Sequence, residues 1–246
     1  MTQTPKVLAF DTSGPFVAIA TKHASYSGGV WQDMARGQAE ALMPLLDDTL
    51  ADAGWGWRDV DVLGVGVGPG NFTGIRIAVA AARGLGLALK IPVFGLTAFE
   101  LASRHLKPQS NALISLRAPR DMAYVQGYDP NGAPVFGMGR IIDPAHPPSD
   151  LHIARNMTVE GYRAREITER LGLETDPEGQ ERIAAVLGDV SAANTPENGP
   201  QRAARMAELT AIKFSEATQP PPPPAPNYIK PADAAPARDA PPQILP

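Results

Sequence analysis

The sequence contains no cysteine among its 246 residues, which excludes disulfide bonds and thiolate metal sites. Histidine is scarce as well, and no two of the four histidines have the spacing that places both on one helix face: His23, His105, His146 and His152. A metal would therefore need ligands gathered from distant histidines and carboxylates. The Gly-x-Ser-x-Gly pattern of serine hydrolases is absent. These absences predict no catalytic residue and no metal site.

Excess positive charge is also missing, because the net charge is −4 and gives no overall basic footprint for nucleic acid. Four arginines could form a local basic patch, although a solvated helix face is the simpler interpretation: Arg155, Arg163, Arg165 and Arg170. No basic region followed by a long apolar stretch opens the chain. The longest apolar region, 75–89, contains two arginines and falls short of the roughly 20 residues that span a bilayer. We therefore expect a cytoplasmic protein with no membrane segment.

The first hundred residues alternate between apolar runs and helical patterns. The expected strands are 7–10, 16–20, 26–31, 60–67 and 93–96. The expected helices are 37–53, 73–89 and 97–103, the last opened by a capping box of Thr97 and Glu100. Because an antiparallel hairpin leads into alternating helices and strands, this order predicts an α/β protein with a mixed sheet flanked by helices.

The remaining chain divides at two changes of composition. Residues 107–110 resemble a domain boundary, and beyond them we expect strands at 112–116, 122–128 and 135–142 and helices at 161–171 and 201–217. From Pro220 prolines dominate, which favours an extended chain. The predicted domains are therefore 1–107, a smaller second lobe at 108–218, and a disordered tail at 219–246, with Tyr228-Ile229 docked on the body.

The strongest local signal is a strand, glycine loop and helix over residues 62–89, centred on GPGNFTG at 68–74. Free N–H groups and the helix dipole favour an anion at such a loop. However, the loop lacks the Walker A lysine and the Gly-x-Gly-x-x-Gly spacing, so a tight turn is an equal interpretation. Residues 11–13 could hold magnesium phosphate or simply form a turn. The candidate nucleotide or anion loop comprises Asp11, Thr12, Ser13, Gly68, Pro69, Gly70 and Thr73.

Small residues recur along the helix after this loop, at 74, 78 and 82 and again at 81, 84 and 88. Glycine costs a helix about 1 kcal/mol relative to alanine, so its presence needs a packing reason. Small side chains let two helices approach closely. The pattern predicts a helix–helix seam, formed either with the helix at 37–53 or with another subunit.

Several blocks resemble the TsaB (YeaZ) family: VLAFDTS at 7–13, GVGPGNFTGIRI at 66–77, RGL at 83–85, and PNYIKP at 226–231. The resemblance is clear over the first 100 residues and weakens from residue 112 onward. Asn71 stands where the family usually has serine, and Gln38-Ala39 where it has histidine or serine. The resemblance implies an actin/Hsp70-like (ASKHA) fold of two lobes.

The resemblance also implies a function in forming N6-threonylcarbamoyladenosine next to the tRNA anticodon. TsaB is a paralogue of the transferase TsaD and binds it through the two helices that flank the glycine loop, and the ATPase TsaE joins them. The residues implied at that interface are Leu42, Leu45, Leu46, Gly74, Ala78, Ala81, Ala82 and Leu85. A homodimer through the same seam is an alternative. The chain would need no cofactor of its own, ATP or ADP would bind at a complex interface, and tRNA would be reached through the complex.

TsaD-like proteins carry a His-x-x-x-His metal motif where this chain has TAFELA at 97–102, without an imidazole. The resemblance therefore implies a non-catalytic subunit. The alternative is an enzyme in its own right, either an ASKHA ATPase using Asp11 and the glycine loop or a glycoprotease-like metallopeptidase. The missing metal pair argues against the peptidase.

Overall fold

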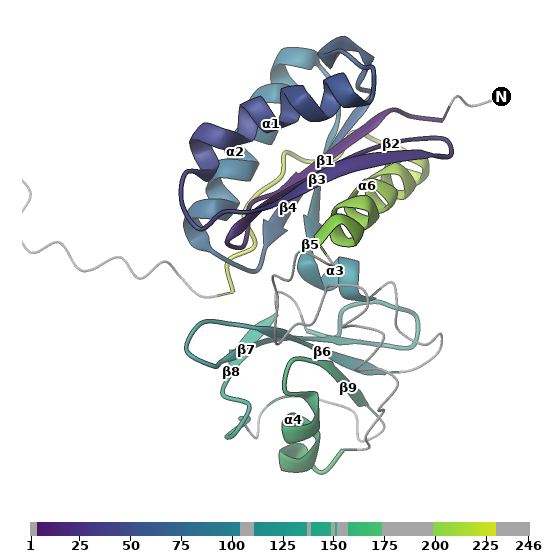
Figure 1. Cartoon of the computed structure of the whole chain (residues 1–246). Coiled ribbons are helices and arrows are strands. Elements are labelled where there is room, and N and C mark those ends of the chain that lie inside the picture. The colour runs from purple at the N-terminus through teal and green to yellow at the C-terminus, as the bar shows by residue number, and fades with distance from the viewer. Residues whose placement is uncertain are drawn as a thin grey trace, which may run out of the picture.

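The computed structural model describes residues 4–103, 111–136, 139–148, 151, 157–173 and 199–229. Two sheets lie one above the other, each with its own helices (Figure 1). The first sheet contains β1 (Val7–Asp11), β2 (Phe16–His23), β3 (Tyr26–Asp33), β4 (Val62–Gly68) and β5 (Val93–Thr97). The second contains β6 (Ala112–Arg117), β7 (Ala123–Tyr128), β8 (Arg140–Ile142) and β9 (Thr158–Gly161). The helices are α1 (Gln38–Asp52), the short 3-10 helix η1 (Trp57–Asp59), α2 (Phe72–Leu89), α3 (Ala98–Ser103), α4 (Ala164–Leu171) and α6 (Gly199–Glu216).

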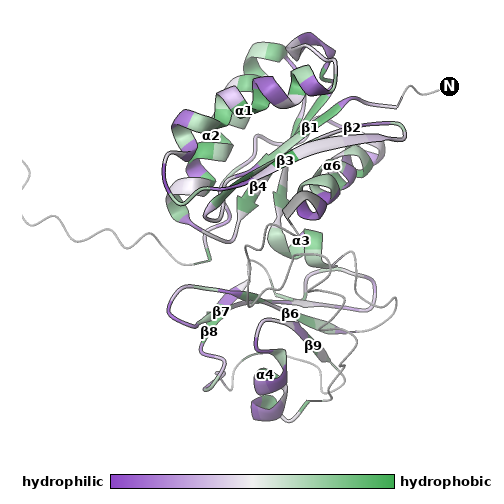
Figure 2. Ribbon diagram, in the orientation of Figure 1, coloured by the Kyte–Doolittle hydropathy of each residue, from purple (hydrophilic) through white to green (hydrophobic). Residues whose placement is uncertain are grey.

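The first sheet is mixed, with strand order β3-β2-β1-β4-β5. Strand β1 is antiparallel to β2 and parallel to β4, which in turn is parallel to β5. Helices α1 and α2 cover one face and α6 covers the other (Figure 1). Successive β1 side chains consequently enter different cores: Leu8 and Phe10 on the α1–α2 side, Val7 and Ala9 on the other. Figure 2 shows that β1 and β4, in the middle of this sheet, are coloured hydrophobic. The predicted fold class is confirmed.

Among the described residues, α2 is the one helix long and apolar enough to cross a membrane, with 18 residues and a mean hydropathy of 1.4. Its inner face nevertheless lies against the first sheet, where Ile75, Ala78 and Val79 are buried. The packing of a core helix therefore accounts for the apolar character of this face.

Helix α6 follows the second sheet in the sequence but packs on the first, mainly against β2 and β1. Ala203, Met206, Ala207 and Leu209 are buried there. The second face of the sheet is apolar and needs a cover, which an amphipathic helix supplies. The first lobe thus consists of the elements from β1 to α3 together with α6, which differs from the predicted division at residues 107 and 218.

The second lobe has strand order β8-β7-β6-β9, with α4 packed against β9. Strand β9 is not anticipated from the sequence, because its four residues show no distinct alternation. Within the described residues of the expected strand at 135–142, β8 covers Arg140–Ile142, and an isolated bridge joins Tyr128 and Pro134 before it. Helix α4 begins at Ala164 because Arg163 takes the left-handed conformation, with φ 49°.

Residues 219–229, here called the strap, extend along the first lobe. The Asn227 N–H donates to the Val67 carbonyl at the end of β4, at 2.8 Å. The Tyr228 ring packs on Phe72 with centroids 4.8 Å apart, and its hydroxyl accepts from Arg76 Nε at 2.8 Å. The strap is therefore docked on the first lobe. The sequence predicts docking for Tyr228-Ile229 alone, within a tail that is otherwise disordered. The boundary at 107–110 and the rest of the tail, 230–246, lie outside the described residues.

Candidate functional site

The glycine loop between β4 and α2 packs directly on the turn that follows β1. The Asn71 N–H donates to the Ser13 carbonyl at 2.6 Å. A Cβ on Gly70 would lie 2.3 Å from that carbonyl oxygen, and one on Gly74 only 1.8 Å from the Thr12 carbonyl oxygen. Contact with the neighbouring turn therefore explains why these two positions are glycine.

Side chains fix the turn at residues 12–16 from two directions. The Thr12 hydroxyl donates to the Gly74 carbonyl at 2.6 Å. At the start of α1, the buried Gln38 amide donates to the Gly14 carbonyl at 2.7 Å and the Phe16 carbonyl at 2.6 Å. Gln38 stands where the resembled family usually has histidine or serine, and here it ties α1 to the turn.

The helix start that the sequence offers to an anion is capped by the chain itself. The Asn71 side-chain oxygen accepts from the N–H of Thr73 at 2.9 Å and of Gly74 at 3.2 Å. Asparagine is among the best N-cap residues because its oxygen satisfies N–H groups that have no partner within the helix. Two of the donors that would bind a phosphate are consequently already used.

Asp11 is buried, with 1% of the residue exposed, and is paired with Arg202 from α6. Arg202 Nη2 lies 2.8 Å from Asp11 Oδ2, and the Ser13 N–H donates to Asp11 Oδ1 at 2.7 Å. The Arg202 guanidinium also lies 5.5 Å from the centre of the Phe16 ring. An internal cation therefore balances the carboxylate that could have faced magnesium phosphate.

The structure thus brings the predicted nucleotide or anion loop together, since residues 11–13 lie against residues 68–74. Its polar groups bind one another, and the side chains of Asp11, Thr12 and Ser13 are buried. Within the described ranges, no three His, Asp or Glu residues gather as they would around a metal ion. The geometry of this loop supports a structural turn better than a catalytic centre.

The residues of the predicted partner interface fall into two groups, one buried and one half-buried. Leu42, Leu46, Gly74, Ala78 and Ala82 are buried in the chain's own core beneath α1 and α2. They cannot meet another protein, because the sheet occupies that side of both helices. The spacing of small residues identifies a packing face, but in this helix that face is intramolecular.

The other three predicted interface residues, Leu45, Ala81 and Leu85, are half-buried. Beside them four residues of α2 are exposed: Ala80, Gly84, Leu87 and Ala88. Leu87 is 82% exposed, and nothing lies within 4 Å of a Cβ placed on Gly84. Met43 on α1 is 39% exposed. We call these five residues the outer face.

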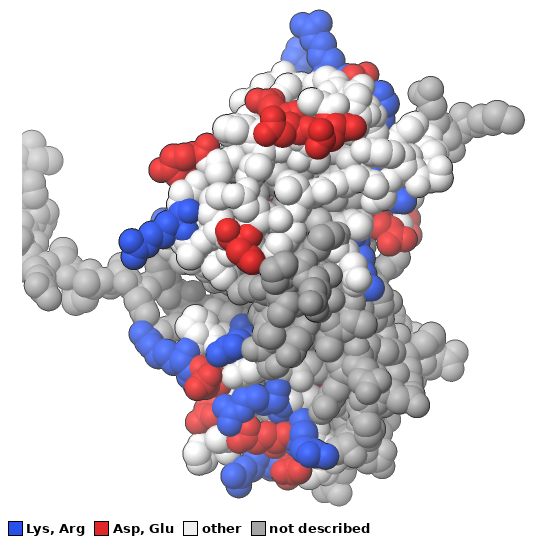
Figure 3. All heavy atoms as spheres, in the orientation of Figure 1, with Lys and Arg blue, Asp and Glu red and all other residues white. Residues whose placement is uncertain are grey.

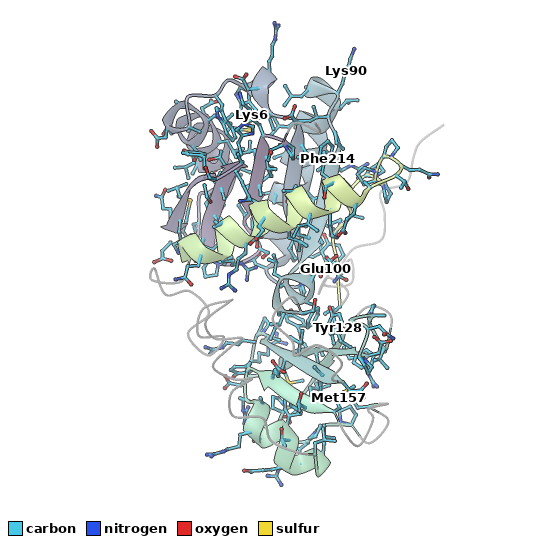
Figure 4. The ribbon with its side chains drawn as sticks, turned by 90° about the vertical axis from the view of Figure 1, so that its right-hand side faces the viewer. Lys6, Lys90, Glu100, Tyr128, Met157 and Phe214 are labelled. Carbon is cyan, nitrogen blue, oxygen red and sulfur yellow. The ribbon has the colours of Figure 1, made fainter. Side chains whose placement is uncertain are left out.

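A further polar cluster lies at the junction of the two lobes, where Figure 4 labels Glu100 and Tyr128. Glu100 and Thr97 form the predicted capping box, with the Thr97 N–H donating to Glu100 Oε2 at 2.7 Å. Glu100 also pairs with Lys213 of α6. Burial, and then the charge of Glu100, raise the pKa of Tyr128 far above its ordinary value. Arg202 and Lys213 are the site residues that sequence reasoning missed, because both lie on a helix distant in the sequence.

Among the described residues of the second lobe, the arginines do not form a separate basic patch. Arg163 pairs with Glu166, and Arg117 lies 3.7 Å from Asp121. Figure 3 shows lysines and arginines interspersed with acidic residues over this part of the surface. Arg155 lies outside the described residues. A solvated surface of mixed charge is the reading that the described residues favour.

A model of a known protein family matches part of the chain. Residues 16–129 match the model of the TsaD family, tRNA N6-adenosine threonylcarbamoyltransferase. No curated protein sequence gives a significant match.

Two solved structures resemble this fold over most of the chain. One, described as an uncharacterized protein with similarity to peptidase YEAZ from Pseudomonas aeruginosa, is 23% identical, covers 92% of this chain and 100% of that chain, and gives a TM-score of 0.64. The other, YeaZ from Pseudomonas aeruginosa, is 23% identical, covers 76% and 92%, and gives a TM-score of 0.52. Residues 16–129 thus match the TsaD family model, and the fold over most of the chain is similar to that of YeaZ, in agreement with the resemblance of the sequence to the TsaB (YeaZ) family.

Proposed function

We propose that this chain is a non-catalytic cytoplasmic subunit that supports a TsaD-like transferase in forming N6-threonylcarbamoyladenosine in tRNA. The observation that carries the proposal is the buried Asp11–Arg202 pair, which lies in a chain whose residues 16–129 match the TsaD family model. A buried carboxylate whose charge is balanced by an arginine, and whose two oxygens each accept an internal hydrogen bond, is poorly placed to bind a metal–nucleotide complex. A partner would therefore have to supply the chemistry.

We place the TsaD-like partner on the outer face. It combines exposed apolar side chains with a glycine whose backbone is open to close approach. A TsaE-like ATPase would join the same complex, ATP or ADP would bind at its interface, and tRNA would be contacted through the transferase. The alternative partner for this surface is a second copy of the chain, which would form a homodimer through the outer face.

Reconstitution tests this function. The chain, a TsaD-like protein and a TsaE-like ATPase are mixed with unmodified tRNA and threonylcarbamoyl-adenylate, and the modified nucleoside is measured by mass spectrometry. We expect no product from the chain alone, and at least tenfold more product from the complete mixture than from the mixture without the chain. The matched control replaces the chain with an unrelated protein at equal concentration.

Two outcomes would contradict the proposal. Product formed by the chain without the TsaD-like protein would make it an enzyme. Equal product with and without the chain would remove its supporting role. Hydrolysis of ATP by the isolated chain, measured in parallel, would instead favour the ATPase alternative.

A further inference from the structure

A large groove lies beyond the C-terminal end of α2, with a volume of about 940 Å³. One wall is the last two turns of α2 with the start of β5, and the other is the end of α6 with the first residues of the strap. Apolar side chains dominate the walls, including Leu87, Phe94 and Phe214. Figure 4 shows Lys90 and Phe214 at the same end of the first lobe. The groove is separate from the glycine loop, which lies at the opposite end of α2.

The charge of this groove is one-sided. Arg83 and Lys90 line it, and none of its lining residues is Asp or Glu. Both side chains are exposed, and within the described part of the chain neither one has an ion pair with an acidic residue. An apolar surface flanked by two such cations is complementary to an apolar segment that carries carboxylates.

The strap wall determines the form of the occupant. Pro220, Pro221, Pro223 and Pro224 line the groove, and proline has no N–H to donate. Because its prolines offer carbonyl acceptors and no N–H donors, this wall cannot form a full β-ladder with an added strand, which favours an occupant that binds mainly through its side chains. A polyproline II segment suits such a wall, because its own backbone makes no internal hydrogen bonds and is already ordered before binding.

The spacing of the two cations sets the spacing of the carboxylates. Arg83 lies in the last two turns of α2 and Lys90 caps its end, seven residues later, so their backbones are separated by about 10 Å along an axis that rises 1.5 Å per residue. A polyproline II chain rises about 3.1 Å per residue with three residues per turn, so acidic residues at i and i+3 lie about 9 Å apart on one side.

We propose that the groove binds an extended, proline-containing segment of a partner protein that carries two acidic residues three positions apart with apolar residues around them. The two carboxylates pair with Arg83 and Lys90, and the apolar side chains cover Leu87, Phe94 and Phe214. This docking site adjoins the outer face and shares Gly84 and Leu87 with it, and it does not require that the partner be TsaD-like.

The test uses the full chain and a peptide with fluorescein at its N-terminus, fluorescein-Pro-Asp-Leu-Pro-Glu-Leu-Pro-amide, with binding followed by fluorescence anisotropy. A second peptide has lysine at both acidic positions. We expect saturable binding of the acidic peptide and at least tenfold weaker binding of the basic one. The double charge reversal Arg83→Glu with Lys90→Glu should weaken binding of the acidic peptide at least tenfold. The same variant should bind the basic peptide more tightly than the acidic one. Thermal melts verify that each variant is folded.

The matched control is Arg36→Glu with Arg58→Glu, two exposed arginines outside the groove, which makes the same change in net charge. It should leave peptide binding within twofold. No binding of the acidic peptide, or equal binding of both peptides, would overturn the proposal. Binding of vesicles of phosphatidylcholine and phosphatidylglycerol at 3:1 without peptide binding would also overturn it, and would make the groove a membrane contact. Because no transferase is present, these outcomes are independent of the reconstitution result.

Discussion

At the residue scale, Arg202 changes what Asp11 can do. A carboxylate at the end of the first strand of an ASKHA fold, next to a hydroxyl-rich turn, favours a metal–phosphate interpretation when only residues 1–100 are considered. Arg202 lies 191 positions further along the chain and reaches Asp11 from the far side of the sheet, at 2.8 Å. No local pattern connects the two residues, so the sequence predicts the turn and not its counter-ion.

Replacing Arg202 by methionine should therefore destabilise the protein by about 3–5 kcal/mol, because Asp11 would remain buried without its partner. Chemical unfolding followed by circular dichroism measures this change in the free energy of unfolding. The exposed Arg165→Met serves as the matched control, with an expected change within about 0.5 kcal/mol.

The double variant Asp11→Asn with Arg202→Met should be more stable than Arg202→Met alone, since it removes the unpaired charge. A loss of less than about 1 kcal/mol for Arg202→Met would show that the pair does not hold α6 to the turn.

At the scale of single elements, α2 shows both the reach and the limit of sequence reasoning. Its bounds, its position after the glycine loop and its small-residue stripes are all predictable, because each is a local property of the sequence. Which stripe faces the sheet is not local. Ala78 and Ala82 turn out to be buried, whereas Ala80 and Gly84 face outward. The faces of α2 have similar composition, and packing against the sheet determines which of them is buried.

Two substitutions on α2 separate folding from partner binding. Ala80→Arg adds a long charged side chain to the outer face, so it should leave the unfolding free energy within about 0.5 kcal/mol and reduce co-elution with the TsaD-like protein at least tenfold. Ala78→Arg places the same side chain in the core, where Ala78 is 0% exposed, and should prevent stable folding.

Size-exclusion chromatography and thermal melts on both variants give the readout. Unchanged co-elution of the Ala80→Arg variant would move the partner surface away from α2. A normal melt for Ala78→Arg would mean that the core beneath α2 is looser than its burial indicates.

At the scale of the whole molecule, the first lobe consists of two parts of the chain separated by the second lobe. Residues 4–103 provide the sheet, α1, α2 and α3, and residues 199–229 provide α6 and the strap. The sequence predicts a division at residue 107 because residues 107–110 resemble a domain boundary. The return of the chain to the first sheet left no such signal, since an amphipathic helix has the same pattern whichever sheet it covers.

A fragment of residues 1–107 should accordingly fail to fold by itself. Without α6, the apolar face that Val7 and Ala9 contribute to would be open to water. We expect the fragment to aggregate or to bind a hydrophobic dye without a cooperative melt. A synthetic peptide of residues 199–229 added in trans should restore part of the cooperative transition. A cooperative melt of the fragment alone would show that α6 is dispensable for the first lobe.

The docking of the strap has a consequence for the order of folding during synthesis. Tyr228 joins Arg76 across 152 positions, so the start of α2 stays uncovered until residue 228 has been synthesised and has left the ribosome. Contacts so distant in sequence are formed late and slow the overall rate, because the intervening chain must first be brought together. We therefore expect the second lobe, whose sheet is closed by nearer neighbours, to become ordered before the first lobe is complete. The N-terminal half of the molecule would then be the last to reach its final structure.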